Sequence, residues 1–276
     1  MRVAAVDTGT NSTRLLVADV DGDHVKPAVR RATVTRLGEG VDATRRLAPA
    51  AVARVHAVLA GYATEIEALG AERTLAVGTS SLRDAADGKD FLRDLEVRFG
   101  WKTRLLSGED EAELTRRGVG AVDERTLVLD VGGGSTELMA GAFRQSLDVG
   151  SVRLTERFLH ADPPSAQELE AAAGYARALL PDLDVDAAIG VAGTVAQLHE
   201  LIGDLTLAAV EDELGRLAAL PLAERRRVPK LDPERAPVIV AGALIIREVL
   251  HHYGLARIEF SERDLLDGIA LEAALA

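Results

Sequence analysis

The hydrophobic and polar positions of the chain predict the same order of strands and helices in each half. In the first half, three apolar runs with polar turns between them predict three neighbouring strands, and periodic helices alternate with short strands after them. The polar, basic and glycine-containing segment 37–47 is expected to be a loop. The other expected elements are strands at 2–6, 14–20, 25–34, 73–77 and 102–106, and helices at 49–69, 90–99 and 107–118.

The second half repeats this order. The expected elements are strands at 125–129, 137–142 and 144–149, helices at 151–159 and 165–180, a strand at 187–191, helices at 195–202, 207–217 and 237–253, a strand at 257–260 and a helix at 264–275. Three meandering strands followed by alternating helices and strands indicate an α/β lobe of the ribonuclease-H-like type, with a mixed sheet flanked by helices. We therefore expect two such lobes, residues 1–122 and 123–276, with the last helix able to pack back on the first lobe.

A short motif, Asp-x-Gly-x-x-Ser-Thr, occurs once in each half. It covers residues 7–13 and 130–136, and each copy directly follows an apolar run. Glycines let backbone N–H groups approach an anion, and the hydroxyls add further donors. A pair of ordinary β-turns is the alternative, because Gly, Asp, Asn and Ser are common turn residues. The shared register in both halves favours two phosphate-binding loops that face one cleft between the lobes.

Composition excludes several classes of function. The 276 residues carry a net charge of −12 and no cysteine, which argues against a nucleic-acid or membrane surface and rules out disulfides and thiolate chemistry. No apolar run approaches the roughly 20 residues that span a bilayer, so a cytoplasmic protein is expected. Basic residues gather at 26–46 and 225–230. Solvated surface explains both runs, although arginine also suits bidentate phosphate contacts.

An acidic block opens the helix expected at 107–118. Ser107 and Asp110 have the spacing of a capping box, and acidic side chains in a first turn complement the helix dipole. Glu109 and Asp110 are therefore interpreted as structural. Glu111 is the better catalytic candidate, since a carboxylate beside a bound phosphoryl group can orient or deprotonate an attacking water.

Seven short blocks occur in order along the chain, at residues 7–12, 78–85, 107–112, 130–137, 150–156, 190–194 and 262–269. Together they resemble the signature blocks of the exopolyphosphatase/guanosine pentaphosphate phosphatase (Ppx/GppA) family, and the resemblance covers nearly the whole chain. The resemblance implies two lobes of the actin-like ATPase superfamily with the active site in the interlobe cleft. It also implies a short form of the family that lacks the extra C-terminal domain of longer members.

The resemblance implies catalytic and binding roles for those residues of this chain that match the family's motifs. Glu111 corresponds to the glutamate that activates the attacking water, and Asp7, Asp130 and Glu137 correspond to acidic residues implicated in metal binding. Phosphate or substrate binding falls on Gly9, Asn11, Ser12, Thr79, Ser80, Arg83, Gly132, Gly133, Gly134, Ser135, Thr136, Gly193 and Thr194. Two structural alternatives stay open: Arg83 could pair with Asp84 or Asp87 on the surface, and Glu137 could simply face solvent.

The activity implied by the resemblance is metal-dependent release of orthophosphate from the end of inorganic polyphosphate. Mg²⁺ is the expected ion, with Mn²⁺ as the alternative, and a homodimer is the expected assembly. Guanosine pentaphosphate is the alternative substrate, because both molecules end in a phosphoanhydride. A kinase-like phosphotransferase and a non-catalytic nucleotide sensor of the same superfamily are the alternatives from other functional classes.

Overall fold

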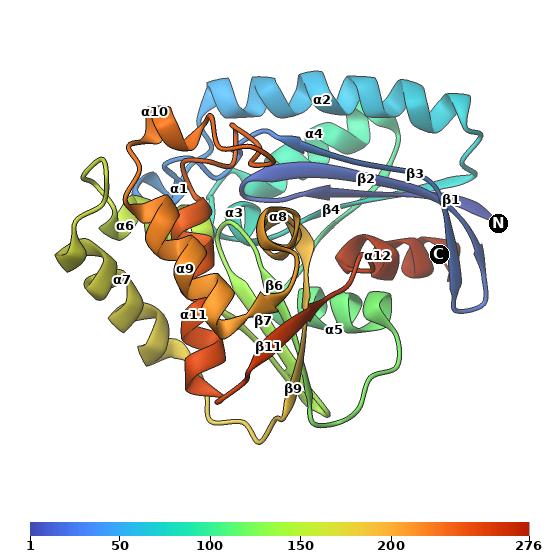
Figure 1. Cartoon of the computed structure of the whole chain (residues 1–276). Helices are drawn as coiled ribbons and strands as arrows, with labels where there is room; N and C mark the ends of the chain where they lie inside the picture. Colours follow the sequence, from blue (N-terminus) through green and yellow to red (C-terminus); the bar gives the residue numbers. More distant parts are fainter. Residues whose placement is uncertain (276) are drawn as a thin grey trace. The chain divides into compact units, whose positions relative to one another are not determined.

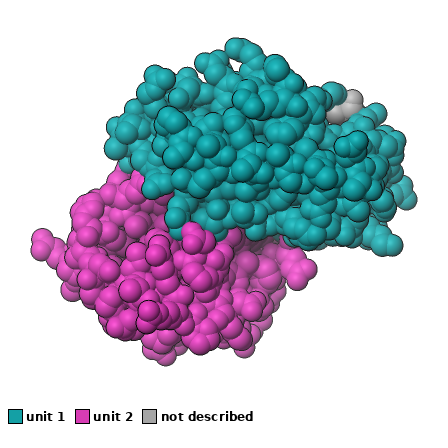
Figure 2. Space-filling model, turned by 90° about the horizontal axis from the view of Figure 1, so that it is seen from above, with its two compact units in different colours: residues 1–121, 263–276 teal, residues 122–262 magenta. Residues whose placement is uncertain are grey.

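The computed structural model describes residues 1–275, and the chain folds as two compact units (Figure 2). The first unit comprises Met1–Ala121 and Arg263–Ala276, and the second comprises Val122–Glu262. The second unit begins at Val122, and the last helix belongs to the first unit, the arrangement that the sequence analysis allowed for that helix.

The first unit is built on a five-stranded sheet with the order β3-β2-β1-β4-β5 (Figure 1). Strands β1, β2 and β3 pair antiparallel, whereas β4 and β5 continue the sheet parallel to β1. The elements are β1 Arg2–Thr8, β2 Ser12–Asp21, β3 His24–Val34, α1 Val41–Thr44, α2 Pro49–Ala68, β4 Arg73–Gly78, α3 Ser80–Asp84, α4 Gly88–Phe99, β5 Lys102–Leu105, α5 Gly108–Val119 and α12 Leu265–Leu275.

Helices cover both faces of this sheet, so its central strand is apolar on both sides. In β1, Ala4 and Val6 belong to the core shared with α2 and α4, while Val3 and Ala5 belong to the core shared with α5 and α12. Successive side chains of a strand point to opposite faces, and a strand buried on both faces is therefore continuously hydrophobic. Residues 3–6 form a continuous apolar run because both faces of β1 are buried.

The second unit repeats the same plan. Its sheet has the order β10-β11-β9-β6-β7-β8, in which β6, β7 and β8 pair antiparallel and β9 and β11 continue parallel to β6. The two-lobe ribonuclease-H-like architecture expected from the sequence is confirmed. The elements are β6 Thr126–Val131, β7 Thr136–Ala140, β8 Phe143–Leu147, α6 Ser151–Phe158, α7 Ala166–Leu179, β9 Ala187–Val191, α8 Ala192–Ile202, β10 Leu205–Thr206, α9 Leu207–Ala218, α10 Leu222–Arg225, α11 Ile239–His252 and β11 Arg257–Phe260.

Four short elements were not predicted from the sequence: α1, which lies in the segment expected to be a loop, and α3, α10 and β10. None is longer than five residues. One turn of helix or two residues of strand contain too few positions to show a hydrophobic period. Within residues 1–275, no helix is long and apolar enough to cross a membrane.

One member of the second basic run has a structural role. The Arg225 side chain is buried and donates hydrogen bonds to the backbone carbonyls of Leu217, Leu220 and Ala236. Burial lowers the pKa of this guanidinium below its ordinary value. Arg225 therefore ties the end of α9 to the loop before α11, and it is neither a solvated surface charge nor a phosphate contact.

Two glycines allow α12 to cross α5 at very close range. A Cβ at Gly118 in α5 would lie 1.9 Å from the carbonyl oxygen of Asp264, and a Cβ at Gly268 in α12 would lie 1.9 Å from that of Leu114. Each helix thus presents a glycine to the backbone of the other. The crossing fixes α12 against the helix that carries Glu111 in its first turn.

We predict that Gly268→Ala destabilises the protein by about 1–3 kcal/mol, as overpacking of a tight contact does. The added methyl group has no space beside a backbone carbonyl, which outweighs the usual gain in helix propensity from Gly to Ala. Gly215→Ala in α9 is the control, because nothing lies within 4 Å of its Cβ position. Urea denaturation should show a loss only for the first variant, and equal stabilities would contradict the tight crossing.

Candidate active site

The two glycine turns have the same backbone geometry. The N–H of Gly9 donates to the carbonyl of Ser12 at 3.0 Å, and the N–H of Gly132 donates to the carbonyl of Ser135 at 3.0 Å. A Cβ at either glycine would lie 3.0 Å from that carbonyl oxygen, so a side chain would crowd both turns. The repeat in the sequence is therefore a repeat of local structure.

The carbonyls of the second turn are held by the start of α6. The carbonyl of Gly132 accepts from Ser151 N at 2.9 Å, and that of Gly133 accepts from Val152 N at 2.8 Å. A trans peptide places its N–H opposite its C=O, so the N–H groups of Gly133 and Gly134 point away from α6. Neither N–H has a protein partner within residues 1–275, and both are available to an anion.

The first turn is held in the same way by the segment after β3. The carbonyl of Thr10 accepts from Gly38 N at 2.9 Å, and the carbonyl of Asn11 accepts from the N–H groups of Thr35 and Arg36, both at 2.9 Å. The peptide N–H of Asn11 therefore points to the opposite side. In both units, a later segment of the chain orients the turn.

Four buried side-chain oxygens near the first turn have no hydrogen-bond partner in the described chain: Asp7 Oδ1, Thr10 Oγ1, Asn11 Oδ1 and Ser81 Oγ. Buried polar atoms in folded proteins nearly always have a partner, so such a group indicates a ligand, a water or an ion. Thr10 and Ser81 were not singled out from the sequence. Both lie inside the motifs that were, and their hydroxyl groups beside the turn are the signal that could have identified them.

Asp7 lies at the end of β1, opposite Arg14 in the register of β1 and β2. Arg14 donates through Nε to Asp7 Oδ2 at 2.9 Å. Burial raises the pKa of the Asp7 carboxyl above its ordinary value, although the charge and hydrogen bond of Arg14 oppose that shift. The carboxylate thus has one oxygen bound to an arginine and the other without a protein partner.

Glu111 and Arg83 lie together in the first unit. Arg83 Nη1 is 2.6 Å from Glu111 Oε2 and also donates to the carbonyl of Leu106 at 3.1 Å. The Glu111 side chain is only 8 % exposed. The aspartates considered as surface partners of Arg83, Asp84 and Asp87, form ion pairs with Arg45 and Arg46. The structure therefore brings the candidate phosphate-binding arginine to the candidate base.

The start of α5 explains the acidic block. Ser107 accepts a hydrogen bond from Asp110 N at 3.0 Å, and Asp110 accepts one from Ser107 N at 3.1 Å, so the predicted capping box is confirmed. The hydrogen bond from Ser107, together with the charge of Arg104, lowers the pKa of Asp110. Glu109 is exposed. Of the three acids, only Glu111 is both buried and held beside an arginine.

Thr79 and Ser80 are buried where β4 passes into α3, and Arg83 follows in that helix. In the second turn Ser135 is also buried, but the Thr136 hydroxyl donates to the carbonyl of Val149 at 2.5 Å. Because the hydroxyl hydrogen of Thr136 is donated to this carbonyl group, the hydroxyl is not placed to donate to a phosphate.

Asp130 and Glu137 are the acids beside the second turn. They are paired residues in the antiparallel register of β6 and β7, and both side chains are buried. Glu137 Oε1 accepts from Ser146 Oγ at 2.6 Å, so the solvent-facing alternative for Glu137 is wrong. No three His, Cys, Asp or Glu side chains within residues 1–275 form a metal site by themselves. Mg²⁺ usually takes one or two carboxylates together with substrate phosphates and water, and the pair fits this need.

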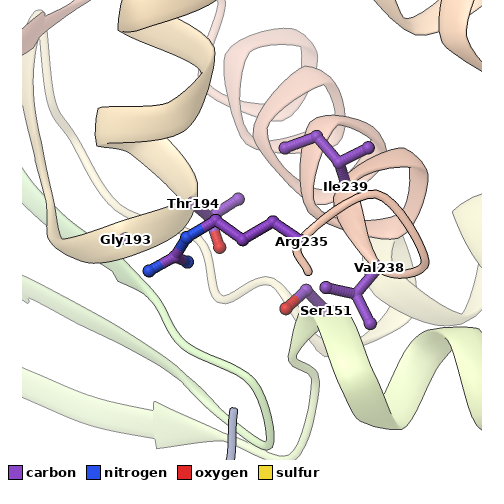
Figure 3. Close-up of a pocket in the computed structure, with 6 residues that line it drawn as sticks. All are labelled: Ser151, Gly193, Thr194, Arg235, Val238 and Ile239. Atoms are coloured by element: carbon purple, nitrogen blue, oxygen red, sulfur yellow. The ribbon is translucent and has the colours of Figure 1, made fainter. Parts of the chain in front are cut away.

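A small hollow lies at the N-terminus of α8 in the second unit (Figure 3). It is lined by Ser151, Gly193, Thr194, Arg235, Val238 and Ile239. A Cβ at Gly193 would lie 2.5 Å from Arg235 Nη1, so the glycine makes room for the guanidinium. Figure 3 shows the Arg235 side chain extending across the hollow toward Gly193. Arg235 and Ser151 were not among the predicted site residues, because they come from segments far from α8 in the sequence.

We predict that Gly150→Ala impairs the second turn. A Cβ at Gly150 would lie 2.5 Å from the carbonyl carbon and oxygen of Gly133 and 2.6 Å from Gly134 N. The turn must shift, and the phosphate-releasing activity that the sequence resemblance implies should lose at least tenfold in kcat/KM, since small misplacements cost about 10²-fold. Gly174→Ala is the matched control in the same unit, because its Cβ position is open. Unchanged kinetics in the first variant would contradict a role for this turn in binding phosphate.

Comparison with known proteins places these features in one family. Residues 16–276 match the model of the Ppx/GppA phosphatase family. "Exopolyphosphatase 2" of Mycobacterium tuberculosis is 36% identical over 314 residues, with 99% of this chain and 98% of the relative covered. "Exopolyphosphatase 1" of Mycobacterium bovis is 27% identical, with 98% of this chain and 88% of the relative covered.

Solved structures agree with this result. A crystal structure of an exopolyphosphatase-like protein superimposes with a TM-score of 0.92 at 28% identity and covers 99% of this chain and 98% of that one. The PPX-GPPA enzyme of Aquifex aeolicus has a TM-score of 0.81 at 28% identity, with 99% of each chain covered. The repeated turns, the glutamate at the start of α5 and the match over nearly all residues have one explanation: the chain belongs to the Ppx/GppA phosphatase family.

Proposed function

We propose that the protein is an exopolyphosphatase, which hydrolyses the terminal phosphoanhydride bond of inorganic polyphosphate and releases orthophosphate. The observation that carries the proposal is the pair formed by Glu111 and Arg83. It combines a buried carboxylate, which can accept a proton from water, with a guanidinium, which can bind a phosphoryl oxygen. The relatives named exopolyphosphatase support the same chemistry.

In the proposed mechanism, the Glu111 carboxylate orients a water molecule and accepts its proton as the water oxygen attacks the terminal phosphorus. The P–O bond to the next phosphate breaks, and that oxygen leaves with its electron pair on the shortened chain. Arg83 and the outward N–H groups of Gly133 and Gly134 stabilise the negative charge on the phosphoryl oxygens. These N–H groups are already oriented before substrate arrives, so no reorganisation is needed.

Asp130 and Glu137, with Asp7 from the first turn, are the residues proposed to hold Mg²⁺ or, as the alternative, Mn²⁺. The unpartnered Asp7 Oδ1 is an oxygen of the kind such ions bind. When bound, the ion would supply positive charge to the phosphoryl oxygens. Glu111 would still provide the base, and Arg83 and the N–H groups of the second turn would still provide the hydrogen bonds.

The hollow at α8 favours inorganic polyphosphate over guanosine pentaphosphate as the substrate. Its lining contains an arginine, two hydroxyl side chains and two aliphatic side chains, and among residues 1–275 no aromatic ring that could stack on a base is part of it. Arg235 also covers Gly193. A guanidinium at a helix N-terminus suits a distal phosphate, because both the charge and the helix dipole attract an anion.

We predict that Glu111→Gln lowers kcat by about 10²–10⁴-fold, the usual contribution of a positioned general base. Glutamine has nearly the same shape, so the melting temperature should change little. Glu109→Gln is the control, because Glu109 is exposed two residues earlier in the same helix turn. Orthophosphate release measures both variants, and wild-type turnover by Glu111→Gln would refute the role of Glu111.

The substrate is tested by orthophosphate release with Mg²⁺ from tripolyphosphate, long polyphosphate, guanosine pentaphosphate and ATP in parallel. We expect release from both polyphosphates without any acceptor molecule, and a lower kcat/KM for the two nucleotides. Higher kcat/KM for guanosine pentaphosphate would overturn the substrate assignment. Phosphate transfer from ATP only to an added acceptor would indicate a kinase, and nucleotide binding with no release from any compound would indicate a sensor.

A further inference from the structure

A partly buried ion-pair network joins the start of α12 to the first glycine turn, entirely within the first unit. Asp264 Oδ2 accepts from Arg14 Nη1 at 2.5 Å, and the same guanidinium donates through Nε to Asp7 Oδ2 at 2.9 Å. Asp264 Oδ1 also contacts Arg30 Nη1 at 3.1 Å. Arg14 therefore bridges the carboxylates of Asp7 and Asp264, and Asp264 lies 250 residues after Arg14 in the chain.

The bridge determines how Asp7 is presented. The β1–β2 register places Arg14 opposite Asp7, but the long arginine side chain still has several rotamers to choose from. In the observed rotamer, Nη1 contacts Asp264 while Nε and Nη2 both face Asp7 Oδ2. With that oxygen occupied, Oδ1 is the atom of Asp7 that stays without a protein partner in the described chain.

Asp264 is itself held rigidly. Its Oδ1 accepts from Leu266 N at 2.9 Å and Asp267 Oδ2 accepts from Asp264 N at 3.1 Å, so the two aspartates cap α12 reciprocally. The glycine crossing with α5 fixes the backbone of the same residue. Burial raises the pKa of Asp264, but the charges of Arg14 and Arg30 outweigh it and keep the pKa below its ordinary value.

We propose that Asp264 is a positioning residue for the first turn: it holds Arg14 on Asp7 Oδ2, so that Asp7 presents Oδ1 alone to the bound substrate and its ion. Asp264 acts through Arg14 and is not a catalytic residue. The inference rests on the proposed function, because Asp7 requires such control only if its turn takes part in phosphate release.

The test variant is Asp264→Asn. Asparagine caps a helix as well as aspartate, so α12 keeps its first turn, but the charge that holds Arg14 is lost. We expect kcat for tripolyphosphate to fall about 10–100-fold, the usual cost of removing a partner that orients a ligand residue, while KM changes less than threefold. Glu272→Gln is the matched control: it removes another ion pair of α12, to Arg104 at 2.7 Å, without touching Arg14. We expect it to keep kcat within about twofold.

A double-mutant cycle separates positioning from stability. If Asp264 acts through Asp7, Asp264→Asn should cost no further activity in an Asp7→Asn background. Additive losses in kcat would overturn the proposal, because they indicate that Asp264 matters for another reason. A fall in kcat that follows a fall in melting temperature equally in Asp264→Asn and Glu272→Gln would overturn it too.

A second readout does not depend on activity. In the protein labelled with ¹⁵N-arginine, the Arg14 Nε–H should give a signal protected from exchange with water, identified by its absence in Arg14→Lys. We expect the protection to be lost in Asp264→Asn and kept in Glu272→Gln. Retained protection in Asp264→Asn overturns the proposal. If the wild-type protein releases no phosphate, the proposed function fails, and this signal still decides whether Asp264 holds Arg14.

Discussion

Each glycine turn depends on the backbone hydrogen bonds that fix its carbonyl groups. In each unit, a segment that follows the third strand donates to these carbonyls, and the trans peptide then directs the next N–H to the other side. The direction of the donors is set by the fold and does not rely on the substrate. A turn without these partners would be free to rotate its peptides, and its N–H groups would not converge on one anion.

The crossing of α5 and α12 is the second constraint. Glu111 lies in the first turn of α5, and Asp264 caps α12, so both acids depend on two helices whose backbones touch through Gly118 and Gly268. Such contact leaves little freedom for either helix to slide, because packed backbones resist small displacements. The geometry of Glu111 and that of Arg14 are thereby linked through one packing contact.

The sequence was sufficient for most local features. Periodicity and the repeated motif predicted the two turns and the strands of both sheets except β10, and the spacing of Ser107 and Asp110 predicted the helix cap. Contacts between distant residues could not be predicted in this way. Arg83 and Glu111 are 28 residues apart, and Arg14 and Asp264 are 250 residues apart. A local sequence pattern does not indicate which of these charged side chains form ion pairs with each other. The metal site stays a prediction for the same reason.

The return of α12 makes the first unit discontinuous in the chain, whereas the second unit is one uninterrupted segment, Val122–Glu262. During synthesis from the N-terminus, the second unit is therefore complete before the first. Until the last helix leaves the ribosome, the sheet face formed by Val3, Ala5 and Leu16 lacks the side chains of α12 that bury it. The first unit, although its translation begins first, therefore cannot complete its packing until residues 263–275 have been synthesised.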